Sequence, residues 1–142
     1  MTRILFVCVH NAGRSQMAEA FFNRLARERG LDARAESAGT APGERVNPVA
    51  AQVMTEAGVS LEGHRPRPLT PAMAAAADRI ITMGCGVDAD ACPAGTYITE
   101  DWQLPDPHGQ PPEVVRAIRD QVRHRVEALA AELAAAPAEA RR

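Results

Sequence analysis

The pattern of apolar and polar positions along the chain predicts four short strands separated by helices. Apolar runs at Arg3–Val9 and Arg79–Met83 are typical of strands that are buried on both faces of a parallel sheet. Ala33–Ser37 predicts a weaker second strand, and Thr96–Ile98 is the expected fourth. Each of these runs is short enough for a strand and too short for a helix of average length.

Apolar residues at helical spacing predict two long helices, over Arg14–Arg29 and Pro112–Ala135. Gly30 follows the first of them and is expected to end it. Two shorter helices, over residues 47–57 and 70–77, each begin with a capping side chain followed by proline. Helices therefore fill the intervals between the expected strands.

Strands that alternate with helices predict an α/β fold. We expect one doubly wound domain with a four-stranded parallel sheet and helices on both faces. The 142 residues fit one domain, which we expect to span 1–136, with a frayed tail at 137–142. Right-handed crossovers would place the end of the first strand at the edge of the sheet where such folds bind ligands.

The composition excludes several classes of function. A net charge of −2 gives no overall attraction to nucleic acid or to an anionic membrane. No apolar run approaches the ~20 residues of a membrane span, and Met1-Thr2-Arg3 leads into a strand rather than a signal peptide. We therefore expect a cytoplasmic monomer with no nucleic-acid or membrane partner. Three cysteines do not make a secreted disulfide framework, so redox or nucleophilic roles are expected for them.

The clearest chemical signal follows the first strand, in the sequence Cys8-Val9-His10-Asn11-Ala12-Gly13-Arg14-Ser15. A thiol, five residues and an arginine can form a cradle for a tetrahedral oxyanion, because backbone N–H groups and a helix start point at one place. Arg14 can hold two anion oxygens, and the same field favours Cys8 as a thiolate nucleophile. The expected oxyanion-binding residues are Val9, His10, Asn11, Ala12, Gly13 and Arg14.

This loop and the downstream Asp106-Pro107 resemble the low-molecular-weight tyrosine phosphatases. The continuation Ser15-Gln16-Met17-Ala18-Glu19, the segment Glu36-Ser37-Ala38-Gly39-Thr40 and two further cysteines look more like the arsenate reductases of that fold. The resemblance extends from Arg3 to about Leu133. It implies that Cys8 is the nucleophile, that Ser15 donates a hydrogen bond to its sulfur and that Asp106 is the general acid.

Cys85 and Cys92 distinguish the two branches of this resemblance, because phosphatase chemistry needs neither of them. The thioredoxin-coupled arsenate reductases carry two cysteines at this spacing after this strand. The resemblance therefore implies a relay in which Cys8 attacks arsenic(V) and Cys85 then attacks the Cys8 sulfur as arsenite departs. Cys92 would next form a Cys85–Cys92 disulfide that thioredoxin reduces. A structural zinc site is disfavoured, since it would need four ligands.

Three other interpretations stay open at this stage. The first is a phosphatase acting on phosphotyrosine, although His108-Gly109 follows Pro107 where family phosphatases usually place aromatic residues. The second is a reductase that uses a small thiol such as mycothiol, which the segments 80–86 and 100–102 also resemble. The third is a non-catalytic sensor of oxyanions or of redox state.

Some reductases of this branch bind potassium through residues that match Asn11, Glu19 and Ser37. A further acidic ligand is expected in the connector that follows, where this chain has Arg65. Arg65 or Arg67 is therefore an alternative source of positive charge. His64, His108 and His124 have no spacing typical of a metal site and are expected at the surface, whereas Trp102 is expected to pack in the core.

Overall fold

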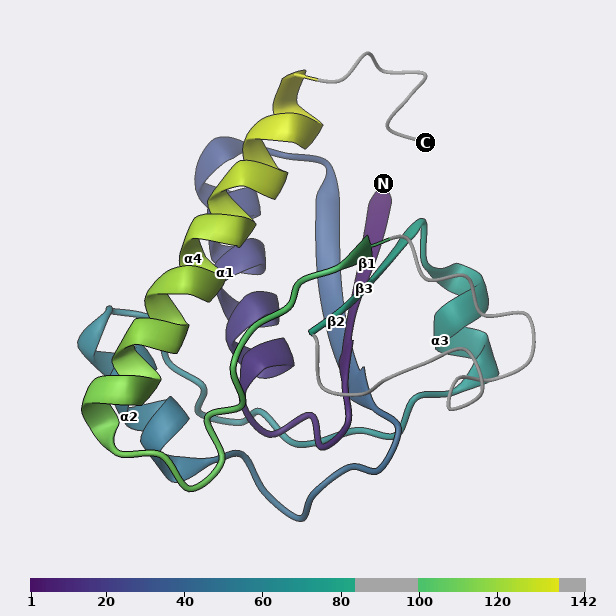
Figure 1. Cartoon of the computed structure of the whole chain (residues 1–142). Helices are drawn as coiled ribbons and strands as arrows, with labels where there is room; N and C mark the ends of the chain where they lie inside the picture. The colour runs from purple at the N-terminus through teal and green to yellow at the C-terminus, as the bar shows by residue number, and fades with distance from the viewer. Residues whose placement is uncertain (84–99, 136–142) are drawn as a thin grey trace.

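A single parallel sheet organises the protein in the computed structural model, which describes residues 1–83 and 100–135. Its strands are β1 (Thr2–Cys8), β2 (Ala33–Gly39), β3 (Arg79–Thr82) and β4 (Glu100–Asp101), in the order β2-β1-β3-β4. Figure 1 shows α1 (Arg14–Arg29), α2 (Pro48–Glu56) and α4 (Pro112–Ala135) on one face of the sheet and α3 (Pro71–Ala76) on the other. The predicted single α/β domain, with helices on both faces of a four-stranded parallel sheet, is confirmed.

The central strand β1 is buried on both faces, as its continuous apolar run predicts. Ile4, Phe6 and Cys8 belong to the large core under α1, α2 and α4. Leu5 and Val7 belong to a smaller core on the other face, against which residues of α3 pack. This alternation follows from the two-residue period of a strand, and it places the Cys8 side chain on the face that α1 covers.

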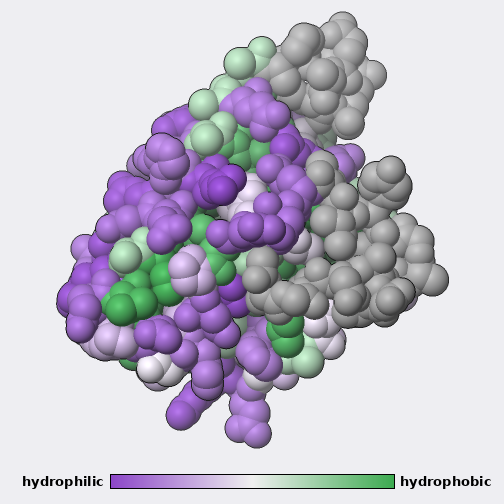
Figure 2. All heavy atoms as spheres, in the orientation of Figure 1, coloured by the Kyte–Doolittle hydropathy of each residue, from purple (hydrophilic) through white to green (hydrophobic). Residues whose placement is uncertain are grey.

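The predicted helix boundaries are confirmed by the caps. Gly30 ends α1 in the left-handed conformation, with φ of 63°. The Asn47 side chain accepts hydrogen bonds from two backbone N–H groups at the start of α2, and the Thr70 side chain accepts one, from the Met73 N–H, at the start of α3. Along α4 an apolar stripe is buried, and Figure 2 shows mainly hydrophilic residues on the outer side of that helix. No helix within residues 1–83 and 100–135 is long and apolar enough to cross a membrane.

The fourth strand of the described sheet is β4. The expected strand at 96–98 lies outside the described residues, and the strand that pairs with β3 is Glu100–Asp101. Both residues of this strand are polar, so no apolar pattern marks it in the sequence. Side-chain contacts hold it at the edge of the sheet: Arg79 donates to Glu100 at 2.7 Å, and Thr82 donates to Asp101 at 2.6 Å. The expected tail at 137–142 also lies outside the described residues. Trp102 is 3% exposed and packs on Phe6, as expected.

Candidate active site

Four carbonyl groups of the loop after β1 point away from the space that the loop encloses. The carbonyls of Cys8, Val9, His10 and Ala12 accept backbone hydrogen bonds, at 2.7–3.2 Å, from Thr40, Ala41, Gly43 and Asn47, respectively. In a trans peptide the next N–H points opposite to the carbonyl, and no cis peptide is present in the described residues. The N–H groups of residues 9, 10, 11 and 13 are therefore directed inward, which suits an anion.

The Cys8 sulfur receives two hydrogen bonds inside this loop. The backbone N–H of Asn11 donates to it at 3.1 Å, and Ser15 Oγ lies 2.9 Å from it. Asn11 Nδ2 donates to Ser15 Oγ at 2.7 Å, so the Ser15 hydrogen is left for the sulfur. The orientation of the Asn11 amide is itself fixed, because its Oδ1 accepts from Gln16 Nε2 and from the backbone N–H of Arg67. Two donors to one sulfur favour its thiolate form.

Asn11 reaches both of these roles through an unusual backbone conformation. Its φ of 51° lies in the left-handed region, where asparagine is tolerated better than most residues. Gly39 packs against it, since a Cβ there would lie 2.5 Å from the Val9 carbonyl oxygen and 3.1 Å from Asn11 Cβ. The loop therefore depends on a residue without a side chain at the end of β2.

The Arg14 guanidinium is buried beside the loop and is held by two backbone carbonyls. Its Nη1 donates to Met83 O at 3.0 Å and to Leu104 O at 2.7 Å, which lie after β3 and after β4. Its Nη2 lies 3.8 Å from Asp106 Oδ1. The planar group thus has a fixed orientation, as bidentate binding of an anion requires.

Asp106 and Pro107 approach the loop from the segment before α4. A Cβ on Gly13 would lie 2.7 Å from Pro107 Cγ, so the proline ring packs directly on that glycine. Asp106 Oδ1 accepts a hydrogen bond from the His108 N–H at 2.9 Å, an Asx-turn contact. The Asp106 side chain is 57% exposed, which leaves its carboxyl open to the space above the sulfur.

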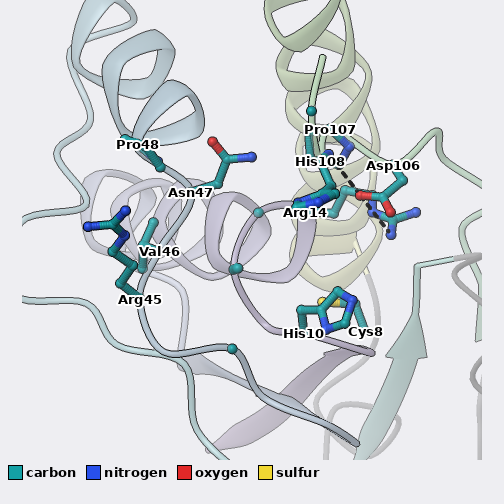
Figure 3. A pocket seen from close by; sticks show the side chains of 14 residues that line it. Cys8, His10, Arg14, Arg45, Val46, Asn47, Pro48, Asp106, Pro107 and His108 are labelled. Carbon is teal, nitrogen blue, oxygen red and sulfur yellow. Dashed lines mark hydrogen bonds and ion pairs between the residues drawn. The ribbon is translucent and has the colours of Figure 1, made fainter.

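These segments enclose a cavity of ≈ 490 Å³. Its walls come from the loop after β1, from residues 43–48 and from residues 106–109. Figure 3 shows Cys8 next to His10, with Arg14 and Asp106 on one side and the side chains of 45–48 across the cavity. The volume lies within the roughly 300–1,000 Å³ of small-molecule pockets, so there is room for more than a five-atom anion.

A second group of polar side chains lies beneath the loop, away from the cavity. Gln16 Nε2 donates to Asn11 O and Oδ1 and to Arg65 O, and its Oε1 lies 2.9 Å from His64 Nδ1. Glu19 Oε1 accepts from Arg67 Nη2 at 2.7 Å and from the Ser37 hydroxyl at 2.9 Å. His64 Nδ1 also lies 3.4 Å from Glu19 Oε2. We call Gln16, Glu19, Ser37, His64 and Arg67 the lower layer.

The structure brings together four of the six predicted catalytic residues, namely Cys8, Arg14, Ser15 and Asp106. Among the predicted anion-binding residues, His10, Ala12, Gly13 and Arg14 line the cavity, whereas Val9 and Asn11 contribute inward N–H groups. Cys85 and Cys92 lie outside the described residues.

Sequence reasoning missed part of the lower layer. His64, which is expected at the surface, is partly exposed, with 22% of its side chain accessible, and it also contacts Gln16 and Glu19, which the sequence does not predict. For Gln16 the resemblance implies no role of its own. Gln16 and His64 are 48 positions apart in the sequence, so no local pattern connects them. His10, which is among the predicted oxyanion-binding residues, has its Nδ1 3.2 Å from the Ala41 carbonyl.

The candidate potassium ligands do not fit a cation in this arrangement. Asn11 Oδ1 already accepts two N–H donors, and Glu19 Oε1 accepts from both Ser37 and Arg67. Within residues 1–83 and 100–135, no group of three or more His, Cys, Asp or Glu side chains is placed to hold a metal ion.

The cysteine and arginine of the loop, with the Asp-Pro segment above them, form the kind of site that the sequence resemblance implied. A comparison with known families agrees: the family "Low molecular weight phosphotyrosine protein phosphatase" matches residues 3–139. The chain belongs to this family.

Within the family, the similar proteins include named arsenate reductases. A putative arsenate reductase of Halobacterium salinarum is 41% identical over 128 residues, covering 88% of each chain. A glutaredoxin arsenate reductase of Synechocystis is 39% identical over 134 residues, covering 94% of this chain and 99% of that protein.

Two solved structures support the same grouping. An arsenate reductase in its phosphate-binding state superposes with a TM-score of 0.81 at 38% identity, covering 94% of this chain and 99% of the other. A thioredoxin-dependent arsenate reductase of Corynebacterium glutamicum gives a TM-score of 0.75 at 32% identity, covering 94% of this chain and 62% of that one.

Proposed function

We propose that this protein is an arsenate reductase that converts arsenate to arsenite with electrons from an external thiol. The observation that carries the proposal is the Cys8 sulfur, held by two hydrogen-bond donors in a loop of inward N–H groups beside the fixed Arg14 guanidinium. Arsenate is a tetrahedral oxyanion, and such a loop suits its charge and shape. Relatives named arsenate reductases at 39–41% identity support the choice of arsenic over phosphorus.

In the first step the Cys8 thiolate attacks the arsenic atom of bound arsenate, forming a sulfur–arsenic bond. One arsenate oxygen leaves as water, and Asp106 donates a proton to it. Asp106 is suited to this role because its carboxyl is exposed at the cavity and lies 3.8 Å from Arg14. Arg14 and the inward N–H groups hold the remaining oxygens as negative charge develops on them.

In the second step Cys85 attacks the Cys8 sulfur. A Cys8–Cys85 disulfide forms, the sulfur–arsenic electron pair stays with arsenic, and arsenite departs as the two-electron reduced product. In the third step Cys92 attacks Cys85, which frees Cys8 and leaves a Cys85–Cys92 disulfide. Cys85 follows Met83 by two positions in the sequence, and the Met83 carbonyl binds Arg14, so the chain leaves the described structure beside the site.

Thioredoxin is the proposed reductant of the Cys85–Cys92 disulfide. The spacing of the two cysteines and the thioredoxin-dependent neighbour in Corynebacterium glutamicum support this choice. The relative named for glutaredoxin makes a glutathione and glutaredoxin pair a direct competitor, and mycothiol is the third candidate. Each would deliver two electrons per arsenite formed.

A phosphatase activity is the second candidate, because the family name and the same thiolate support attack on a phosphate ester. The pocket disfavours an aryl substrate: His108 and Gly109, rather than aromatic rings, line it after Pro107. We therefore expect arsenate to be the better substrate.

Turnover with three donor systems tests the proposal. Reduced protein is given arsenate with thioredoxin and its reductase, with glutathione and glutaredoxin, or with mycothiol, and arsenite is measured. Thioredoxin should sustain many turnovers in the wild type, while Cys92→Ser should stop after about one arsenite per protein. Cleavage of p-nitrophenyl phosphate is measured on the same samples.

Three results would change the account. Undiminished cycling of Cys92→Ser with thioredoxin would remove the third step. Turnover with a small thiol alone would assign that donor and leave Cys92 without a role. Efficient p-nitrophenyl phosphate cleavage without arsenite from any donor would replace the reductase with the phosphatase.

A further inference from the structure

The lower layer contains a positive charge where the resemblance implies a metal cation. Arg67 Nη2 donates to Glu19 Oε1 at 2.7 Å, and the same oxygen accepts the Ser37 hydroxyl at 2.9 Å. Glu19 lies in the first turns of α1 and is buried, with its side chain 11% exposed. A buried carboxylate needs a cation or hydrogen-bond donors, and Arg67 supplies both.

Arg67 also reaches the loop directly through its main chain. Its backbone N–H donates to Asn11 Oδ1 at 2.9 Å, and its carbonyl accepts from the Gly39 N–H at 2.8 Å. Asn11 Nδ2 then donates to Ser15, which is hydrogen-bonded to the Cys8 sulfur. One residue thus joins the buried carboxylate of α1 to the side chain that orients the hydrogen bonds of the nucleophile.

We propose that the Arg67 guanidinium permanently occupies the place of a potassium ion, so that the anion-binding loop is pre-organised without any added cation. The oxygens expected to bind potassium are Asn11 Oδ1, Glu19 Oε1 and Ser37 Oγ. The first two already receive two donors each, and Ser37 donates its hydrogen to Glu19. Arg67 is therefore a positioning residue, which acts on Cys8 through Asn11 and Ser15.

Removal of the guanidinium should create a site that a soluble cation can enter. The Arg67 side chain is 45% exposed, so its place is open to solvent once it is truncated. Arg67→Ala keeps the backbone N–H bond to Asn11 and loses only the contact with Glu19. Glu19 would then retain Ser37 and His64 as neighbours but no permanent positive charge.

The test measures two properties of the loop, neither of which requires arsenate reduction. One is the affinity for inorganic phosphate by calorimetry, and the other is the rate of Cys8 alkylation by iodoacetamide in Cys85→Ser/Cys92→Ser protein. Both are measured at equal ionic strength in four chloride salts, namely those of potassium, sodium, choline and guanidinium, the last at low concentration. The variants are Arg67→Ala, Arg67→Lys, Glu19→Gln/Arg67→Ala and the control Arg65→Ala, whose side chain is exposed on the same connector.

For the wild type and for Arg65→Ala, the phosphate affinity and the Cys8 alkylation rate should be the same in all four salts. Arg67→Ala should bind phosphate on the order of tenfold more weakly in choline, with recovery in potassium or guanidinium, and Arg67→Lys should retain most of the affinity. In Glu19→Gln/Arg67→Ala the loss should be smaller than in Arg67→Ala, because no buried carboxylate remains to be neutralised.

The proposal would be overturned if the wild type needed potassium for full phosphate affinity. It would also be overturned if Arg67→Ala bound phosphate as tightly as the wild type in choline, or if no cation restored the affinity that Arg67→Ala loses. If Arg67→Ala does not fold, the salt series on the wild type and on Arg67→Lys still decides the question. A wild type that binds no phosphate would contradict the proposed oxyanion site instead, and the alkylation rates would then test Arg67 independently.

Discussion

Replacement of Gly13 by alanine tests whether the packing of Pro107 on the loop positions Asp106 for proton transfer. The new Cβ would lie 2.7 Å from Pro107 Cγ, whereas ordinary contact distances begin at 3.4 Å. The proline ring must therefore move by about 0.7 Å to restore that contact. Asp106 is adjacent in the chain and its carboxylate is bonded to the His108 N–H on the other side, so the carboxyl moves with the ring.

The expected effect is on catalysis more than on stability. A displacement near 1 Å at a reacting group can reduce a rate by about 100-fold, and we expect Gly13→Ala to lose about 10- to 100-fold in single-turnover arsenite release. Overpacking usually lowers the free energy of unfolding by about 1–3 kcal/mol. Because the residues beside Pro107 are exposed and can move, we expect Gly13→Ala to lose an amount near the lower end of that range. The Cys8 alkylation rate should stay within about twofold of wild type, because the donors to its sulfur do not touch Pro107.

Gly43→Ala is the matched control. Gly43 lines the same cavity, but a Cβ there would approach nothing closer than 3.9 Å. Arsenite release is measured by rapid quench for both variants, with alkylation measured in parallel. Equal rates for Gly13→Ala and Gly43→Ala would refute the reasoning, as would a fall in alkylation that matches the fall in turnover.

Three further predictions concern single contacts. Ser15→Ala removes the Ser15 hydrogen bond to the Cys8 sulfur, so iodoacetamide alkylation of Cys8 should shift to more alkaline pH. Asn11→Ala should be less stable than Asn11→Gly by about 1 kcal/mol in urea unfolding, because only alanine is strained at φ of 51°; equal stabilities would contradict this. The hydrogen bonds from Arg116 hold the pKa of Glu56 below its usual 4.5. That pair stabilises the fold fully above about pH 4.5, and its contribution is lost as pH falls through the lowered pKa. The Tm gap between wild type and Arg116→Ala should therefore persist at neutral pH and shrink as the pH is lowered through that pKa.

Much of the fold was predictable from local chemistry. The buried apolar run of β1, the capping pairs Asn47-Pro48 and Thr70-Pro71, and Gly30 after α1 each act over a few residues, so their signals survive in the sequence. The cysteine–arginine spacing was informative for the same reason, because one loop holds both ends of the motif.

Features that depend on distant partners could not be predicted. β4 is a two-residue polar strand that is fixed by Arg79 and Thr82 rather than by apolar burial. The carbonyls of the loop are oriented by residues 40–47, which from the sequence form only a glycine-containing connection. The lower layer joins α1 to a connector more than 40 residues away, and no periodicity reports such a contact.

The account rests on attack of the Cys8 thiolate on arsenic, and a single-turnover experiment tests this most directly. Fully reduced protein is mixed with excess arsenate without any reductant, and arsenite and thiol oxidation are measured after an acid quench. The wild type should release about one arsenite per protein and end with a Cys85–Cys92 disulfide and Cys8 returned to a thiol, Cys92→Ser should release about one and end with a Cys8–Cys85 disulfide, and Cys8→Ser should release none. Arsenite formation by Cys8→Ser, or by wild-type protein in which no disulfide forms, would contradict the account.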